Sequence, residues 1–244
     1  MDDKFFWLAL IVLFSYTTQA MSGFGSTILA LTLGIHLYPI EVLLPVLVPL
    51  DMLVNLYLVV RHQGHINRPL LFRSILPAMG IGVLAGILVF HFIQAVTLKK
   101  IFGLLVILLS TRELYRLLRK GLDQKTLSRL GSTVYITLAG LVHGIYASGG
   151  PLLIYAVSKL NPPKSVFRST LAAVWLIFSV ILTASYVIAG TFSGDSLRFI
   201  AMLLPVIIFG LLLGEWLHHR IDEYFFRIFV FIVLLLAGFS ICLG

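Results

Sequence analysis

Apolar residues run through almost the whole chain, and only short polar stretches interrupt them. Most runs have the length of roughly 20 residues with which an α-helix crosses the apolar part of a bilayer. The first and fifth runs are longer, and small and polar residues break each of them near its middle. The pattern predicts an all-α polytopic membrane protein with about eight hydrophobic segments, at residues 5–37, 40–60, 70–93, 98–118, 131–159, 165–190, 197–217 and 224–243.

A motif in the third segment returns in the seventh segment. LPAMGIGVLAG, from Leu76 to Gly86, and LPVIIFGLLLG, from Leu204 to Gly214, share a Leu-Pro pair and two glycines four positions apart. Because a broken segment also opens each half, the chain reads as a duplication. Glycines with this spacing lie on one helix face, so we expect them to be packing contacts. The predicted divisions are 1–120 for the first repeat, 121–130 for a polar linker and 131–244 for the second repeat.

Composition agrees with a lipid environment. Hydrophobic residues make up 59% of the chain and charged residues 11%, whereas soluble domains carry about 25% charged residues. The net charge is +8, but the basic residues lie in short loops rather than in one stripe, so we do not expect nucleic acid as a partner. The only cysteine, Cys242, excludes an intrachain disulfide and a cysteine-based metal site. We expect neither a metal nor a cofactor.

The distribution of lysine and arginine favours a hairpin in each broken segment. If both broken segments crossed the membrane, the 18 basic residues would divide eleven to seven. If both double back, only Lys4, Lys99, Lys100 and Arg198 stay on the side of the N-terminus, and the other fourteen lie opposite. The second division obeys the positive-inside rule better, although a broken helix that crosses is the alternative. With three crossings per half the repeats are inverted, the linker region 112–130 is cytoplasmic and both termini are periplasmic.

The two breaks are the first candidates for a substrate site. In the second break, Ser148, Gly149 and Gly150 precede Pro151, and proline fits the first turn of a half-helix. The free N–H groups and the positive dipole end of that half-helix would face a ligand that the glycines allow to approach closely. Helix packing by small residues is the alternative explanation. The first break offers Ser22, Gly23, Gly25, Ser26 and Thr27 for the same purpose.

Three further polar residues are candidates for lining the cavity. His143 lies five residues before Ser148, and Gln19 lies at the equivalent place before the first break. His143 can also bind a proton near neutral pH, or it can be a hydrogen-bonded packing residue. Arg168, at the beginning of the sixth segment, either binds an anion through two hydrogen bonds or anchors the helix at the lipid headgroups.

Asp51 lies in the middle of the second segment, where a carboxylate is costly and needs a partner. Asn55 is one turn away on the same helix face. Asp51 either binds a coupling proton or cation, or is a hydrogen-bonded structural group near Pro45 and Pro49. At the offset that relates the two breaks its counterpart is Trp175, so the carboxylate is not duplicated.

Both halves have a glycine-rich break in the first segment and a proline near the end of that segment, Pro39 and Pro163. In this, the chain resembles the sulfite exporter TauE/SafE family over essentially its whole length. The second half carries the resemblance most clearly, in Gly149-Gly150-Pro151, Tyr155, Pro162-Pro163 and Phe167-Arg168-Ser169-Thr170-Leu171.

The resemblance implies an inner-membrane carrier for small organosulfur or related organic anions. It places the site at Gly23, Gly25, Gly149 and Gly150 with Ser26, Ser148 and Pro151, and more loosely at Arg168. Three successive glycines are common in the first break of the family, whereas this chain has Ser22-Gly23-Phe24-Gly25-Ser26. The bulky Phe24 is expected to reshape the pocket.

We therefore expect a secondary transporter of a small anion, such as sulfite, a sulfonate like sulfoacetate, or a related organic acid. The substrate is expected at the facing breaks near the membrane midplane, with alternating access and with Asp51, Asn55 and His143 as candidates for proton coupling. The expected partners are the substrate and the lipid bilayer, and exposed small residues are compatible with a homodimer. Two alternatives are an intramembrane serine protease, with Ser148 as nucleophile and His143 as base, and a noncatalytic membrane scaffold.

Overall fold

The computed structural model describes residues 3–22, 25–119, 127–160, 163–218, 220 and 223–243. All regular elements in these ranges are helices, and they follow the predicted hydrophobic segments in order. The expected all-α membrane architecture is therefore confirmed for the described residues. Within the described ranges, five helical stretches are long and apolar enough to cross a membrane, namely Asp3–Met21, Ile40–His65, Arg68–Phe90, Ser165–Ile188 and Gly194–Leu217.

The helices form two compact units, and each unit takes segments from both halves of the chain. Unit 1 comprises Met1–Leu44, Ile93–Asp123 and Ser196–Gly244, and unit 2 comprises Pro45–Phe92 and Gln124–Asp195. Most of unit 1 is built from α1 (Asp3–Ser22), α2 (Ser26–Gly34), α6 (Ala95–Leu118), α10 (Gly194–His218) and α11 (Glu223–Leu243). Most of unit 2 is built from α3 (Ile40–His62), the 3-10 helix η1 (Gln63–His65), α4 (Arg68–Leu70), the π-helix η2 (Leu71–Ile75), α5 (Leu76–Phe92), α7 (Arg129–Tyr146), α8 (Gly150–Ser158) and α9 (Lys164–Ile188).

The second broken segment is a helical hairpin made by α7 and α8. The rings of Tyr135 and Tyr155 lie with their centroids 4.9 Å apart. In a straight helix, residues separated by 20 positions would be about 30 Å apart. The chain therefore doubles back between α7 and α8, as the charge distribution predicted.

The first broken segment, α1 followed by α2, also doubles back. A Cβ atom at Gly34 would lie 3.6 Å from Leu8 Cδ1, although 26 positions separate the two residues. A continuous helix would hold them about 39 Å apart. Residues Ser26 to Thr32 of α2 are buried, so this half-helix lies inside protein and not in lipid.

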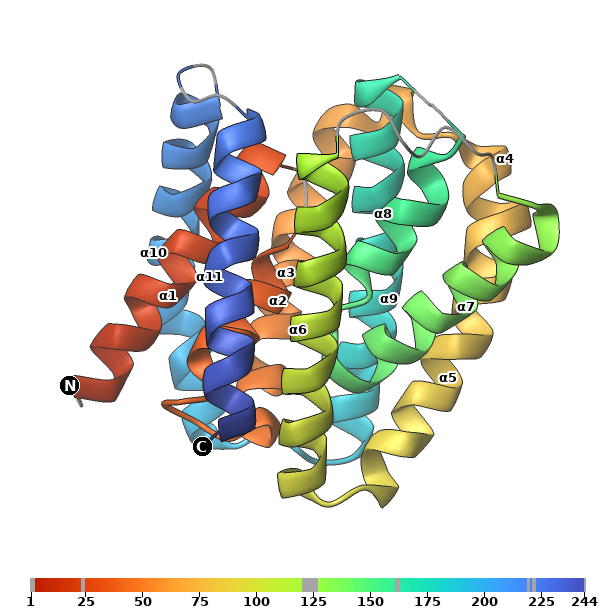
Figure 1. Cartoon of the computed structure of the whole chain (residues 1–244). Coiled ribbons are helices and arrows are strands. Elements are labelled where there is room, and N and C mark those ends of the chain that lie inside the picture. The colour runs from red at the N-terminus through yellow and green to blue at the C-terminus, as the bar shows by residue number, and fades with distance from the viewer. Residues whose placement is uncertain are drawn as a thin grey trace. The chain divides into compact units, whose positions relative to one another are not determined.

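Glycines of α5 allow it to touch α7 along its length, and Figure 1 shows the two helices side by side in unit 2. A Cβ atom at Gly82 would lie 2.1 Å from Thr137 O, and one at Gly86 would lie 2.4 Å from Leu141 O. Only a hydrogen atom fits in this space, so the backbones approach more closely than any other residue permits. The expectation that Gly82 and Gly86 are packing contacts is confirmed.

The second pair of glycines packs in the same way in unit 1, but less tightly. Cβ atoms at Gly210 and Gly214 would lie 3.2 Å from Leu13 O and 2.5 Å from Thr17 O, so α10 lies on α1. In the same unit α6 packs along α11, where Gly103 faces Ile241. Each Leu-Pro helix thus packs on the broken segment that opens the other half of the chain.

The prolines of the two Leu-Pro pairs have different positions. Pro77 is the second residue of α5, which directly follows the π-helix η2. Because proline has no N–H and its ring excludes the carbonyl one turn before it, the wider π turn relieves the clash. Pro205, in contrast, lies inside α10 and does not begin it.

Candidate functional site

The second break is formed by three residues with well-defined roles. Helix α7 ends at Tyr146, and Ala147 then adopts a left-handed conformation with φ of 51°, while its N–H donates to His143 O at 2.7 Å. This geometry is the usual way to close a helix, but it is uncommon for a residue with a Cβ atom. The Ser148 hydroxyl donates to Tyr146 O at 2.8 Å. The Ser148 side chain is therefore held against the end of α7.

Helix α8 begins without a side-chain cap. Gly149 occupies the N-cap position, where its carbonyl accepts from Leu153 N, and Pro151 lies in the first turn, as the sequence predicted. The first-turn N–H groups of a helix have no acceptor within the helix, and together they carry its positive dipole end. Ser148 and Pro151 are buried. The start of α8 therefore presents positive character inside unit 2.

Glycine at position 149 is required by close packing and not by backbone conformation. Its φ of −71° is accessible to any residue. A Cβ atom there would lie 2.1 Å from Ala139 O and 3.0 Å from His143 Cβ. At Gly150, by contrast, the nearest atom to a Cβ would be Trp175 Cζ2 at 3.9 Å. The hairpin can therefore close tightly only because residue 149 has no side chain.

His143 is buried beside the break and stacks on Trp175. The two ring centroids are 5.3 Å apart with an interplanar angle of 28°, and the ring of Phe178 approaches from the side at 6.2 Å. Neither ring nitrogen of His143 has a hydrogen-bond partner among the described residues. An unsatisfied buried polar group costs about 1–3 kcal/mol. A hydrogen-bonded packing role for His143 therefore has no support in this structure.

Helix α9 also joins the second break to Asp51. Asp51 Oδ2 accepts from Asn55 Nδ2 at 2.9 Å and from Ser179 Oγ at 3.1 Å. Ser179 follows Trp175 by one helical turn, so both side chains lie on the same face of α9. Successive turns of one helix therefore contact His143 and Asp51. The hydrogen bonds give Asp51 the buried partners that an intramembrane carboxylate needs.

Arg168 lies in the first turns of α9 and is half-buried. Trp175 is seven positions further along the helix, which corresponds to roughly 10 Å along its axis. Nearby, the Thr170 hydroxyl accepts from Asn67 N at 3.0 Å and fastens α9 to the loop before α4. Arg168 therefore lies on the same helix as Trp175, about two turns before it.

The first break has a different backbone geometry. Gly25 precedes α2 with a left-handed φ of 98°, and no atom lies within 4 Å of the place where its Cβ would be. Ser26 and Thr27 follow it in the buried first turn of α2, and Gln19 is buried in the last part of α1. Gly23 lies outside the described residues, as do 121–126 of the predicted linker, and Ser22 is described only as the last residue of α1.

Comparison with known proteins decides the family. The family described as Sulfite exporter TauE/SafE matches the chain over residues 8–241. The chain belongs to the TauE/SafE family. No curated protein and no solved structure matches it. The TauE/SafE chain is therefore a multi-pass membrane protein of a family of transporters for sulfite-type anions, and it is not an enzyme.

The geometry of the break agrees with this exclusion of catalysis. A serine protease needs its nucleophile within hydrogen-bonding distance of a base. Here the Ser148 hydroxyl donates to a backbone carbonyl, and the His143 ring stacks on an indole. The Ser148–His143 pairing that the protease alternative required is not formed.

Two residues of this TauE/SafE site were not among those expected from the sequence. Trp175 stacks on His143, and the Ser179 hydroxyl donates to Asp51. Trp175 follows Asp51, and Ser179 follows Asn55, by the same number of positions that separates the two breaks. This shared spacing was the sequence signal that could have identified them. A second missed feature is the pair Gly140 and Gly144, a glycine-xxx-glycine motif in α7 that receives α5.

Proposed function

We propose that this TauE/SafE protein is a secondary transporter that moves a small anion across the inner membrane by alternating access. The substrate class is sulfite, a sulfonate such as sulfoacetate, or a related organic acid. One observation carries the proposal: a buried histidine with two unbonded ring nitrogens lies beside the uncapped start of α8. A small anion would accept hydrogen bonds both from the histidine and from the N–H groups at the start of the helix.

Polar groups at the second break would gain hydrogen bonds from a bound anion. Backbone N–H groups at a helix start attract negative charge through hydrogen bonds and through the helix dipole. Neutral His143 adds a further N–H donor beside the break. We assign Ser148, Gly149, Gly150, Pro151 and His143 to substrate binding in unit 2, and Gln19, Ser22, Gly23, Gly25, Ser26 and Thr27 to the equivalent role in unit 1.

The proposal includes two inverted repeats with divisions at 1–120, 121–130 and 131–244. Support comes from the shared plan of the halves: each begins with a helical hairpin, and each Leu-Pro helix packs through glycines on the hairpin of the other half. Three crossings in each half reverse the second repeat relative to the first. When two inverted repeats exchange their conformations, a site between them opens to the other side of the membrane, which is the basis of alternating access.

Orientation is the part of the proposal that labelling tests directly. We propose a cytoplasmic linker at 112–130 and periplasmic termini, because this arrangement collects most lysine and arginine in the cytoplasm. Cys242 is replaced by serine, and single cysteines are introduced at Lys100 and Arg119. Membrane-impermeant maleimide on intact cells should label the first and spare the second. The reverse labelling would contradict the proposed orientation.

We further propose that transport is coupled to protons through Asp51 and His143. Both side chains contact α9, so a change in protonation at one is communicated to the other by movement of a single helix. Arg168, on the same helix, is proposed to attract the anion. A pH gradient should therefore accelerate anion flux, and Asp51→Asn should remove the acceleration.

Tracer flux into proteoliposomes tests the central proposal. Sulfite, sulfoacetate, sulfate, taurine and simple carboxylates are supplied in turn. His143→Phe keeps a ring against Trp175 but removes both nitrogens, so flux should fall at least about tenfold while stability stays equal or rises. His65→Phe, the same substitution at an exposed histidine in η1 outside both breaks, is the matched control and should retain flux. Absence of saturable flux for every anion, from folded and inserted protein, would falsify the proposal.

A homodimer is part of the same proposal. Its mass in lipid nanodiscs, measured without crosslinking, distinguishes one copy from two. Loss of flux on dissociation would show that the pair is required for transport.

A further inference from the structure

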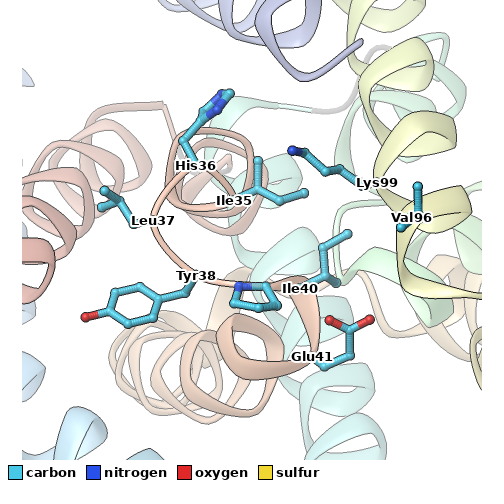
Figure 2. A pocket seen from close by; sticks show the side chains of 9 residues that line it. Ile35, His36, Leu37, Tyr38, Ile40, Glu41, Val96 and Lys99 are labelled. Atoms are coloured by element: carbon cyan, nitrogen blue, oxygen red, sulfur yellow. The ribbon is translucent and has the colours of Figure 1, made fainter. Parts of the chain in front are cut away.

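Unit 1 contains a surface cavity that the proposed transport site does not use. It has a volume of about 270 Å³ and lies where the turn between α2 and α3 meets the first turns of α6 (Figure 2). This volume corresponds to roughly nine water molecules, so the cavity suits a small ligand and not a nucleotide. Its lining includes Ile35, His36, Ile40, Glu41, Val96 and Lys99.

Charged side chains of opposite sign occupy different parts of the cavity. Figure 2 shows the Lys99 ammonium group pointing toward His36, whereas the Glu41 carboxylate lies beyond Ile40. Neither Lys99 nor Glu41 takes part in an ion pair with another described residue. Lys99 and Glu41 therefore share one cavity without forming an ion pair with each other.

His36 contributes a neutral donor next to the lysine. It lies in the turn after α2, outside the membrane-spanning helices. Burial, and secondly the positive charge of Lys99, hold the pKa of His36 below its usual value. The imidazole is thus neutral at neutral pH and offers one N–H to an acceptor.

We propose that this cavity binds a small zwitterion, with its anionic group on Lys99 and His36 and its ammonium group on Glu41. The apolar side chains of Ile35, Ile40 and Val96 would cover the short carbon chain between the two charges. A simple anion would satisfy Lys99 but leave Glu41 without a partner, and a simple cation would do the reverse. The same chemistry occurs in free amino acids and in the headgroup of ethanolamine phospholipids.

Calorimetric titration of the purified full-length protein tests the zwitterion requirement. The protein is held in nanodiscs of phosphatidylglycerol, and the probes are β-alanine, O-phosphoethanolamine, propionate and ethylamine. Each zwitterion should bind saturably and at least about tenfold more tightly than either singly charged compound, because the latter lacks one charge-assisted contact. Binding of propionate as tight as that of β-alanine, or no binding by any probe, would overturn the proposal.

Lipid composition identifies the source of the zwitterion. If an ethanolamine headgroup occupies the cavity, nanodiscs containing phosphatidylethanolamine should no longer bind β-alanine. If a free zwitterion is the ligand, β-alanine should bind equally in both lipids. Either result supports the cavity as a zwitterion site and names its occupant.

Charge variants locate the binding in this cavity. Lys99→Gln and Glu41→Gln should each weaken β-alanine binding about ten- to hundredfold, the range expected for loss of a hydrogen bond to a charged group. Lys100→Gln is the matched control, because this exposed neighbour does not line the cavity, and it should bind normally. Unchanged affinity in Lys99→Gln would refute the assignment. Anion flux in the same preparations reports separately on the proposed transport.

Discussion

The two broken hairpins have the same outline but depend on glycine for different physical reasons. In the first break Gly25 has a left-handed φ of 98° and open space around it. In the second break Gly149 has an ordinary φ but almost touches Ala139 O. The first glycine supplies a conformation, and the second supplies close approach. Similar glycine patterns in the two breaks therefore do not imply similar structural constraints.

The helices that pack on the hairpins also differ, because the helix in unit 2 packs more closely than the helix in unit 1. In unit 2, α5 meets α7 with backbone atoms 2.1 to 2.4 Å from the Cβ positions of Gly82 and Gly86. In unit 1, the corresponding distance on α1 is 2.5 Å at Gly214 but 3.2 Å at Gly210. Unit 2 therefore holds its hairpin by backbone contact at both glycines, whereas unit 1 does so only at Gly214 and leaves room at Gly210. The largest consequences of substitution are therefore expected in unit 2.

The strongest test exchanges one glycine in each supporting helix. Gly82→Ala should lower the free energy of unfolding by about 3 kcal/mol, because the new methyl group overlaps the Thr137 carbonyl and neither backbone can retreat. Gly210→Ala should cost less than about 1 kcal/mol. Unfolding by SDS titration of the purified protein measures both. Equal losses would show that the difference in packing has no energetic weight.

Within the second break, Gly149→Ala should destabilise by about 2 kcal/mol by pushing α8 away from Ala139. The same substitution at Gly150, where the nearest atom is 3.9 Å away, should change stability by no more than about 0.5 kcal/mol. Thermal unfolding of both variants in detergent gives the comparison. A stable Gly149→Ala protein would mean that the hairpin is not closed as tightly as described.

At the first break, backbone strain and not steric overlap determines the loss of stability when Gly25 is substituted. Gly25→Ala should cost about 1 kcal/mol, since a left-handed conformation is unfavourable for residues with a Cβ atom. Gly25→Asn should cost less, because asparagine tolerates this conformation. Thermal unfolding of the two variants ranks them. If alanine and asparagine were equally harmful, conformation would not be the reason for glycine at this position.

The smallest expected effect concerns the polar contact of α9 in unit 2. Ser179→Ala and Asp51→Asn, alone and combined, form a double-mutant cycle around the 3.1 Å hydrogen bond. We expect a coupling energy of about 0.6 kcal/mol, typical of hydrogen bonds inside membrane proteins. The SDS titration used for the glycine variants measures the unsubstituted protein and the three variants. A coupling energy of zero would remove Ser179 as a partner of Asp51.

Much of the fold followed from the sequence because lipid imposes simple rules. Apolar runs of the right length located the helices, and polar interruptions located both breaks. The charge distribution favoured hairpins, which the contacts Tyr135–Tyr155 and Gly34–Leu8 confirm. Packing roles for Gly82, Gly86, Gly210 and Gly214 were also expected from their spacing and are observed. Family membership agrees with the resemblance seen in the motifs.

Other features depended on contacts between residues that are distant in the sequence. Apolar periodicity does not say which aromatic residue meets a given histidine, so Trp175 was read only as the counterpart of Asp51 and not as a partner of His143. The hydrogen bond from Ser179 to Asp51 spans 128 positions and arises from the packing of α9 on α3. The zwitterion cavity likewise combines a turn and a helix that only folding brings together.

The amino-acid sequence alone was enough to place this chain in a membrane, to divide it into helices and to locate its two breaks. These features are local, because each depends on the cost of exposing polar backbone or charge to lipid over a stretch of about 20 residues. The reason for each glycine, the surroundings of His143 and the partners of Asp51 depended on tertiary structure. Steric overlap and hydrogen bonding act over a few ångströms, and only the folded chain defines which atoms lie that close.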